Sequence, residues 1–162
     1  MTSGPVGRPP GDTDWITVLD RNGLEILGRD ECLALVASSP VGRVALSADA
    51  LPVVLPVNHR LLGDSVVFAT GVGSKLLSME KGTVVAFEAD AFDPASRSGW
   101  SVLVVGVAHQ ITEGDREWGP ANALDLHPWV GHHASYLVRL TTERISGRRL
   151  RPAPAPPPPR RR

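Results

Sequence analysis

Short runs of alternating apolar and polar residues fill the middle of the chain and predict β-strands rather than long helices. Between Val41 and Asp90 four such runs are separated by turn signals such as Leu62-Gly63-Asp64. The longest apolar run and the alternation near residue 138 add two more. The expected strands are Gly42–Ser47, Pro52–Asn58, Ser65–Ala69, Thr83–Ala89, Trp100–Ile111 and Ala134–Thr141.

Helical patterns are few and short. Gly28–Ser39 has an acidic first turn, carries Cys32, Leu35 and Val36 on one face, and is ended by Pro40. Weaker helical patterns cover Lys75–Met79 and Asp115–Leu126, and Trp15–Leu19 suits a short strand or anchoring segment. Strands at spacings of about 10–15 residues favour an antiparallel barrel, because parallel βαβ units need longer helices between strands.

The length of 162 residues fits one domain, which we expect at 15–150. The Gly/Pro-rich segment 1–14 and the Pro/Arg tail 151–162 contain too few core-forming residues and are expected to be disordered. The tail is either a solvated extension or a binding segment, which would be recognised through its prolines or would contact an anionic surface.

Charge and cysteine content narrow the function classes. Four of the 17 basic residues lie in the tail, which leaves 13 basic against 17 acidic residues in 1–150 and argues against a nucleic-acid-binding body. The single cysteine, Cys32, excludes an intrachain disulfide framework. The chain shows neither a signal peptide at its start nor an apolar run long enough for a membrane span, so a cytoplasmic protein is expected.

A small polar loop, Thr70–Lys75 (TGVGSK), is the strongest candidate site. Glycines let backbone N–H groups approach an anion, hydroxyl groups donate hydrogen bonds, and Lys75 supplies charge. Lysine is otherwise almost absent, since only Lys75 and Lys81 accompany fifteen arginines. The alternative interpretation is a plain hairpin connection.

The ordered segments VGRVAL, LPVVLPVNH, VVFATGVGSKL, GTVVAFEAD and SGWSVLVVGVA, followed by YLVRL and RISGRRL, resemble the pyridoxamine 5′-phosphate oxidase-like family. The likeness covers about Leu27 to Leu150 and is strongest to a bacterial branch grouped with nitroimidazole-resistance-type flavoproteins. It implies a mainly β protein, an antiparallel six-stranded split β-barrel with a few short helices. It also implies a homodimer with FMN at the interface.

The resemblance also implies roles for individual residues. The strand around Pro56 would lie along the isoalloxazine ring, and the strand end with its loop would hold the ribityl phosphate. One departure is Ala69, where many relatives have a basic residue; the loss of one charge-assisted contact, roughly 1.5–3 kcal/mol, would weaken binding about tenfold to a hundredfold unless Arg43 or Arg60 compensates. The ring-side set is Leu55, Pro56, Val57 and Asn58; the phosphate-side set is Phe68, Thr70, Ser74 and Lys75; Trp100 and Ser101 would approach across the dimer.

Other chemistry-bearing residues have simpler interpretations. His59 suits a proton donor by its pKa range, yet a histidine after a strand is more often a hydrogen-bonded loop residue. Glu88 and Asp90 share one strand face and suit a solvated or arginine-paired pair. The histidines of 127–133 match no metal-site spacing, so neither a metal nor a catalytic side chain is predicted.

Three functional hypotheses follow. The first is a small FMN-dependent oxidoreductase acting on a small molecule, in which the flavin carries the electrons and no protein nucleophile is needed. The second exchanges FMN for the deazaflavin F420. The third is a non-catalytic flavin- or tetrapyrrole-binding module. Oxidation of pyridoxamine phosphate itself is not expected, because the C-terminal part lacks a convincing substrate-phosphate set.

Overall fold

The structure, a computed structural model, describes residues 17–48, 50–71, 82–126 and 134–152. The predicted disordered segment 1–14, the helix predicted at Lys75–Met79 and all but Arg151 and Pro152 of the tail lie outside these residues. Within the described part, no helix combines the length and apolarity needed to cross a bilayer.

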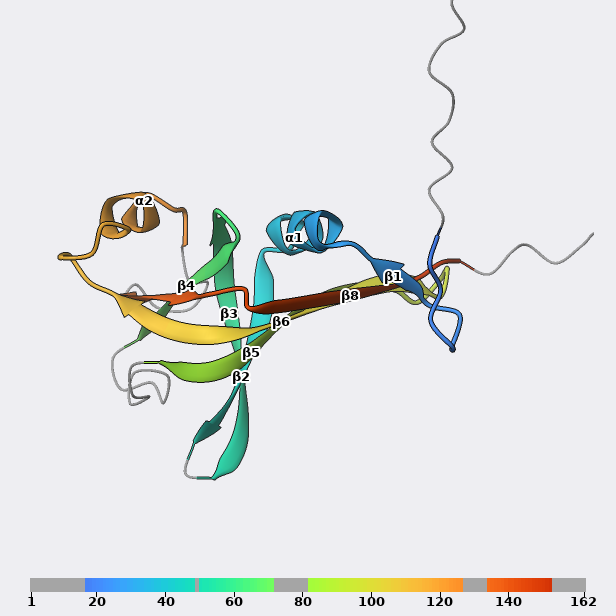
Figure 1. The fold of residues 1–162 in the computed structure, drawn as a ribbon, viewed down its shortest axis with the longest axis horizontal. Helices are drawn as coiled ribbons and strands as arrows, with labels where there is room; N and C mark the ends of the chain where they lie inside the picture. Colours follow the sequence, from blue (N-terminus) through green and yellow to red (C-terminus); the bar gives the residue numbers. More distant parts are fainter. Residues whose placement is uncertain (1–16, 49, 72–81, 127–133, 153–162) are drawn as a thin grey trace, which may run out of the picture.

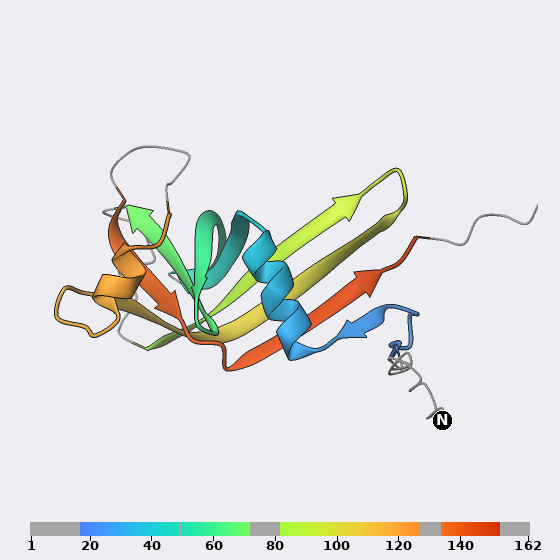
Figure 2. The same ribbon diagram turned by 90° about the horizontal axis from the view of Figure 1, so that it is seen from above.

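Eight strands and two helices make up the described chain (Figures 1 and 2). Five of the six predicted strands are longer in the structure than the sequence pattern indicated. The elements are β1 (Glu25–Leu27), α1 (Arg29–Ser38), β2 (Val41–Ala48), β3 (Leu51–Leu62), β4 (Ser65–Gly71), β5 (Thr83–Asp93), β6 (Ser98–Ile111), α2 (Trp118–Asn122), β7 (Ala134–Leu140) and β8 (Arg144–Leu150).

The sheet is antiparallel and runs in the order β1-β8-β6-β5-β2-β3-β4-β7. A further pairing of β6 with β7 joins the two ends of the six-strand part and closes a barrel, which confirms the predicted fold class. The strands β1 and β8 were not predicted and extend the sheet beside β6. Residues 17–19 of the predicted segment at Trp15–Leu19 form no strand and make one isolated bridge, Leu19 to Glu25.

Helix α1 covers the inner face of the sheet, where it contacts β8, β3 and β6 (Figures 1 and 2). Its predicted apolar face is confirmed, because Cys32 and Val36 are fully buried. The helix packs closely because β8 has Gly147 beneath it: a Cβ there would lie 2.6 Å from the sulfur of Cys32. Burial raises the pKa of that thiol.

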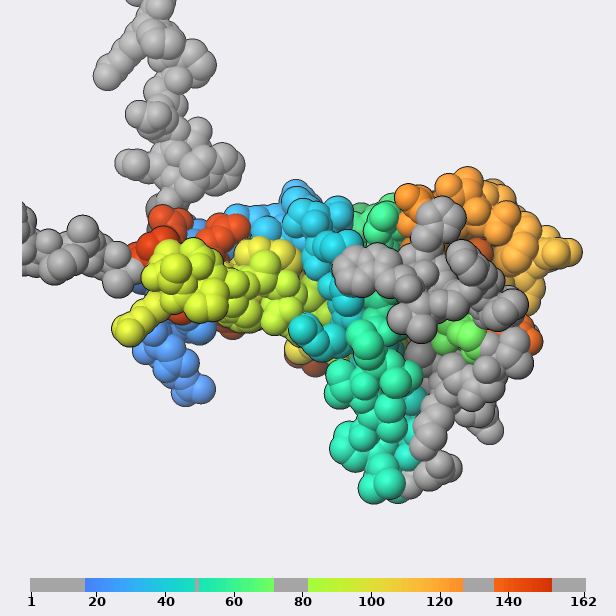
Figure 3. All heavy atoms as spheres, turned by 180° about the vertical axis from the view of Figure 1, so that it is seen from behind, coloured from blue at the N-terminus to red at the C-terminus, as the bar shows by residue number. Residues whose placement is uncertain are grey.

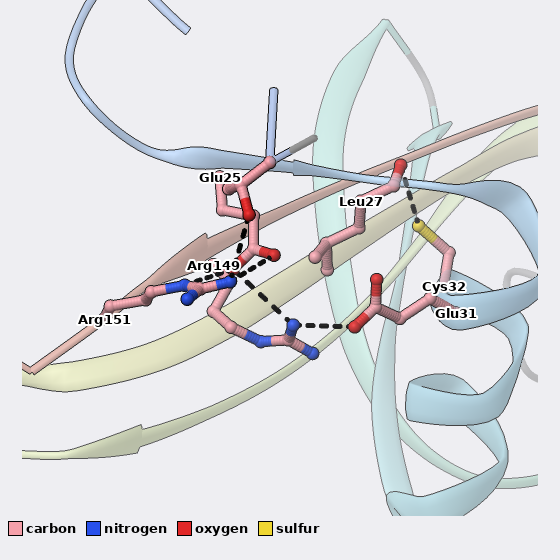
Figure 4. A network of polar contacts seen from close by, with 7 residues as sticks. Glu25, Leu27, Glu31, Cys32, Arg149 and Arg151 are labelled. Atoms are coloured by element: carbon pink, nitrogen blue, oxygen red, sulfur yellow. Dashed lines mark hydrogen bonds and ion pairs between the residues drawn. The ribbon is translucent and has the colours of Figure 1, made fainter. Parts of the chain in front are cut away.

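Ion pairs fasten β1 and α1 to the end of β8 (Figure 4). The Glu25 carboxylate accepts hydrogen bonds from Arg151 at 2.8 and 2.9 Å, and these contacts hold the pKa of Glu25 below its ordinary range. Arg149 pairs with Glu31 of α1 at 2.6 Å and lies 3.6 Å from Glu25. The strand β8, with the sequence RISGRRL, is rich in arginine, and these ion pairs compensate its charge where it joins the sheet.

Candidate functional site

The register of the barrel decides which side chains share a face. Residues directly opposite each other in an antiparallel ladder point to the same side of the sheet. One continuous rung across four strands therefore places Pro56, Arg43, Glu88 and Leu103 on a common face. The neighbouring rung places Val54, Ala45, Ala86 and Val105 there too.

This outer face, on the side opposite the barrel core, is partly exposed and carries several apolar side chains. Val54 is 59% exposed and Leu103 is 43% exposed, although neither side chain carries a polar atom. Exposed apolar residues that gather on one sheet face mark a binding surface more often than scattered ones do. The residues of the outer face used below are Arg43, Ala45, Val54, Pro56, Asn58, Arg60, Ala86, Glu88, Asp90, Ser101, Leu103 and Val105.

The predicted ring-side stretch alternates across the strand β3. Pro56 is exposed and Asn58 half-buried on the outer face, whereas Val57 is buried in the barrel core and Leu55 packs against that core. Pro56 has no N–H to give to the ladder. A group lying along this strand on the outside therefore meets the side chains of Pro56 and Asn58, and only the backbone of the other two residues.

The strands β3 and β4 diverge beside this stretch. Their ladder ends at the pair His59–Phe68, after which β3 stays with β2 and β4 continues along β7 to Gly71. Figure 3 shows the hairpin of β2 and β3 standing out from the body of the molecule. The ring-side stretch and the end of β4 thus flank the point where the sheet splits.

The predicted phosphate-side residues fall partly within the described chain. Phe68 is fully buried in the core, so that only its backbone can meet a ligand, and Thr70 is buried beside a register shift in the β4–β7 ladder. Ala69 is half-buried against the apolar cluster beneath α2. The predicted residues Ser74 and Lys75 lie outside the described residues.

Trp100 and Ser101 lie elsewhere in the sheet. Both belong to the extension formed by β5, β6 and β8, where Ser101 pairs with Arg148 and Trp100 with Arg149. Leu103, two residues further along β6, is three strand spacings from Pro56, or about 14 Å. Within one protomer the structure does not bring Trp100 and Ser101 to the ring-side stretch.

Arg43 on the outer face is held by two carboxylates. Its guanidinium donates to Glu88 at 2.9 Å and to Asp90 at 2.8 Å, and these contacts raise the pKa of Arg43. The predicted arginine-paired reading of Glu88 and Asp90 is confirmed. Together the three side chains carry one net negative charge beside the apolar residues of the outer face.

His59 is a core residue of β3 and lies in no loop. It is 1% exposed, packs edge-to-face on Phe87 with ring centroids 4.7 Å apart, and its Nε2 donates to the carbonyl oxygen of Val36 at 2.9 Å. Its Nδ1 has no hydrogen-bond partner among the described residues. Burial lowers the pKa of His59, so the ring is neutral at pH 7.

We predict a pH-dependent stability that originates at His59. Because its folded pKa lies below the ordinary 6.5, the unfolded chain takes up the proton first, and stability falls as the pH drops below 6.5. The slope is at most about 1.4 kcal/mol per pH unit. Urea unfolding at pH 7.5 and pH 5.0 should show a larger loss for the wild type than for His59→Gln.

The carboxylates with lowered pKa values do not interfere in this range. Asp20, Glu25 and Asp93 lose their stabilising effect only below their ordinary values of 3.8 to 4.5. Equal losses of unfolding free energy in the wild type and in His59→Gln would show that another group titrates.

A polar hollow that the sequence did not indicate lies beside α2. His109, Thr112, Asp115, Glu117 and Arg139 line it, and Arg139 forms an ion pair with Glu117. The hollow does not include any predicted site residue. In the described residues no group of three or more His, Cys, Asp or Glu side chains is arranged to hold a metal, and the histidines at 127, 132 and 133 lie outside them.

The described barrel, with two added strands and an exposed apolar outer face beside a strand divergence, is a split barrel. The family model described as pyridoxamine 5′-phosphate oxidase matches residues 28–149. The chain belongs to this family, which confirms the resemblance found in the sequence.

Individual relatives agree with this assignment. An uncharacterized Mycobacterium tuberculosis protein, Rv0080, is 38% identical over 129 residues, which cover 76% of this chain and 84% of that protein. A solved FAD binding protein from Mycobacterium smegmatis is 33% identical, with a TM-score of 0.66 over 78% of this chain and 97% of that one. A putative pyridoxamine 5′-phosphate oxidase from Corynebacterium glutamicum is 30% identical, with a TM-score of 0.70 over 81% and 96% of the two chains.

Proposed function

We propose that the protein binds a flavin nucleotide, FMN, on the outer face beside β3, as a homodimer, and acts as a small flavin-dependent oxidoreductase. The observation that carries this proposal is the pair of exposed apolar side chains of Val54 and Pro56 on β3, next to the point where β3 and β4 diverge. On the same face, beyond the ion pair of Arg43 with Glu88, lies the exposed side chain of Leu103. Membership of the family and the similarity to a FAD binding protein support it.

The residues present fit a flat aromatic ring with an anionic tail. Val54 and Pro56 give an apolar floor, and Asn58 supplies a side-chain amide at the edge of that floor. The diverging end of β4 and the loop with Ser74 and Lys75 would hold the phosphate. Burial of the ring excludes water from it, and a bound flavin supplies the electron transfer that no described side chain can perform.

A second copy of the chain completes this arrangement in our proposal. The outer face is too apolar to remain in water without cost, and a symmetric dimer would cover it with the same face of the partner. A partner would also supply Ser101, which shares the outer face with Leu103 but in a single protomer lies too far from the ring-side stretch. Trp100 turns to the opposite side of β6, where it packs against the core.

The nature of the nucleotide is tested by titration. Apo-protein obtained by acid treatment is titrated with FMN, FAD and F420, and bound ligand is measured by quenching of flavin fluorescence or by F420 absorbance. We expect FMN to bind in the micromolar range or tighter. Tighter binding of FAD would move the proposal to that nucleotide, as the name of the Mycobacterium smegmatis relative suggests. Preference for F420 would support the deazaflavin alternative, and no binding of any of them would overturn the proposal.

A non-catalytic binding module is the second candidate. Arg43 pairs with Glu88 and Asp90, so these three charged groups of the outer face are occupied by one another. This pairing favours a binding module, because an enzyme would need such groups for contact with a substrate. Reduction of the bound flavin by NADH or NADPH, followed anaerobically at the flavin absorbance band, separates the two candidates. A flavin that stays oxidised with both donors and with a reductase would favour the module.

A further inference from the structure

Arg60 lies on the outer face of β3, at the point where the sheet splits. Its neighbour His59 points into the core, so alternation along the strand turns Arg60 outward. Val67 of β4 is its partner across the ladder, one rung before the ladder ends. The guanidinium folds back along β3, where Nη1 donates to the carbonyl oxygen of His59 at 2.8 Å.

Arg60 is also the one arginine in the described residues that is half-buried without a carboxylate partner. The other half-buried arginines of this part pair with Glu117, Asp20 and Glu31. The arginines without an ion pair in the described chain are otherwise exposed: Arg21, Arg97, Arg116 and Arg144. A cation partly removed from water loses solvation, and an anion brought beside it would restore that loss.

Arg60 lies near Ala69, the position at which the family resemblance implies a basic residue. Ala69 follows Val67 by two residues and so lies on the same side of β4. Ala69 comes one residue after the last pair of the β3–β4 ladder, so Arg60 and Ala69 lie on either side of the point where the two strands diverge. The competing candidate, Arg43, is already neutralised by Glu88 and Asp90.

We propose that Arg60 is the phosphate ligand that replaces the missing basic residue at position 69. This assignment rests on the proposed function and gives the phosphate end of the flavin nucleotide a cation from the described part of the chain. It predicts that the chain recognises the phosphate monoester of FMN itself and not only the ring system.

Riboflavin, which carries the same ring without the phosphate, makes the test specific. Dissociation constants for FMN and riboflavin are measured by fluorescence quenching for the wild type, Arg60→Gln, Arg60→Lys and Arg116→Gln. Arg116 is exposed and has no ion pair among the described residues, so its replacement removes the same charge away from the outer face. Thermal unfolding of each variant shows that it is folded.

We expect Arg60→Gln to weaken FMN binding about tenfold to a hundredfold, the range for one charge-assisted hydrogen bond. Riboflavin affinity should change less than about threefold, Arg60→Lys should recover part of the loss, and Arg116→Gln should leave both ligands unaffected. An unchanged FMN-to-riboflavin ratio in Arg60→Gln would overturn the assignment and leave the proposed function in place. A wild type that binds neither ligand would overturn both.

Discussion

Replacing Gly106 with alanine is expected to prevent the barrel from closing and to leave the protein largely unfolded. A Cβ at this position in β6 would clash with the carbonyl oxygen of Thr141 and lie 2.7 Å from its carbonyl carbon. The backbone there cannot retreat freely, because Thr141 exchanges hydrogen bonds with Val107: its N–H donates to the Val107 oxygen at 3.1 Å, and its hydroxyl accepts from the Val107 N–H at 3.0 Å.

The expected cost of this substitution exceeds about 4 kcal/mol, which is a large part of the stability of an average domain. Urea or thermal unfolding followed by circular dichroism measures it. Gly114→Ala is the matched control: nothing lies within 4 Å of its added Cβ, and stability should change by less than about 0.5 kcal/mol. A Gly106→Ala protein within about 1 kcal/mol of the wild type would contradict the described contact of β6 with the turn after β7.

The strands of the barrel could be predicted because each buries one or both faces in an ordinary apolar core. The strand β8 could not, since its inward positions are Ile145, Gly147 and Arg149, which include a single large apolar side chain. What makes it a strand is tertiary: α1 packs over Gly147, and carboxylates of β1 and α1 face Arg149. The strand β1 has only three residues, which is too short for an alternation of apolar and polar residues to be recognised.

His59 shows why a polar residue near a strand end is difficult to place from sequence. The pattern favoured a loop after Asn58, but β3 continues to Leu62 and carries His59 into the core. The cost of burying the ring is offset by the carbonyl oxygen of Val36 in the last turn of α1, which accepts a hydrogen bond from the Nε2–H of His59. No local feature of the sequence reveals that helix end as the partner.

The candidate site could be predicted only in part, because the sequence does not specify how the strands pair. Leu55, Pro56 and Val57 are all apolar, so the sequence could not tell which of them face outward; the register with Arg43 and Glu88 selects Pro56. The β3–β4 register places Arg60 beside the split, and the ion pairs with Glu88 and Asp90 show that Arg43 is engaged. The distance of Trp100 and Ser101 from this stretch likewise depends on strand order, which no spacing in the chain specifies.

Replacing Leu103 with aspartate is expected to abolish the proposed dimer and, with it, flavin binding. Leu103 is 43% exposed on the outer face and lies opposite Glu88 in the β5–β6 ladder, so a second carboxylate there adds repulsion as well as desolvation. In a two-fold dimer the change occurs twice. We expect dimer affinity to fall more than about a hundredfold, since each 1.4 kcal/mol contributes a factor of ten.

The design separates a dimer effect from a direct one, because Leu103 lies about 14 Å from Pro56 in its own protomer, three strand spacings away. Loss of FMN binding together with loss of the dimer in Leu103→Asp is therefore the result expected if the partner subunit completes the site. Light scattering gives the oligomeric state, fluorescence titration gives the affinity, and Val18→Asp places the same charge at a residue that is 54% exposed outside the barrel sheet. A monomeric Leu103→Asp variant that still binds FMN normally would show that one chain holds the flavin alone, and a wild type that is monomeric at all concentrations would remove the dimer from the proposal.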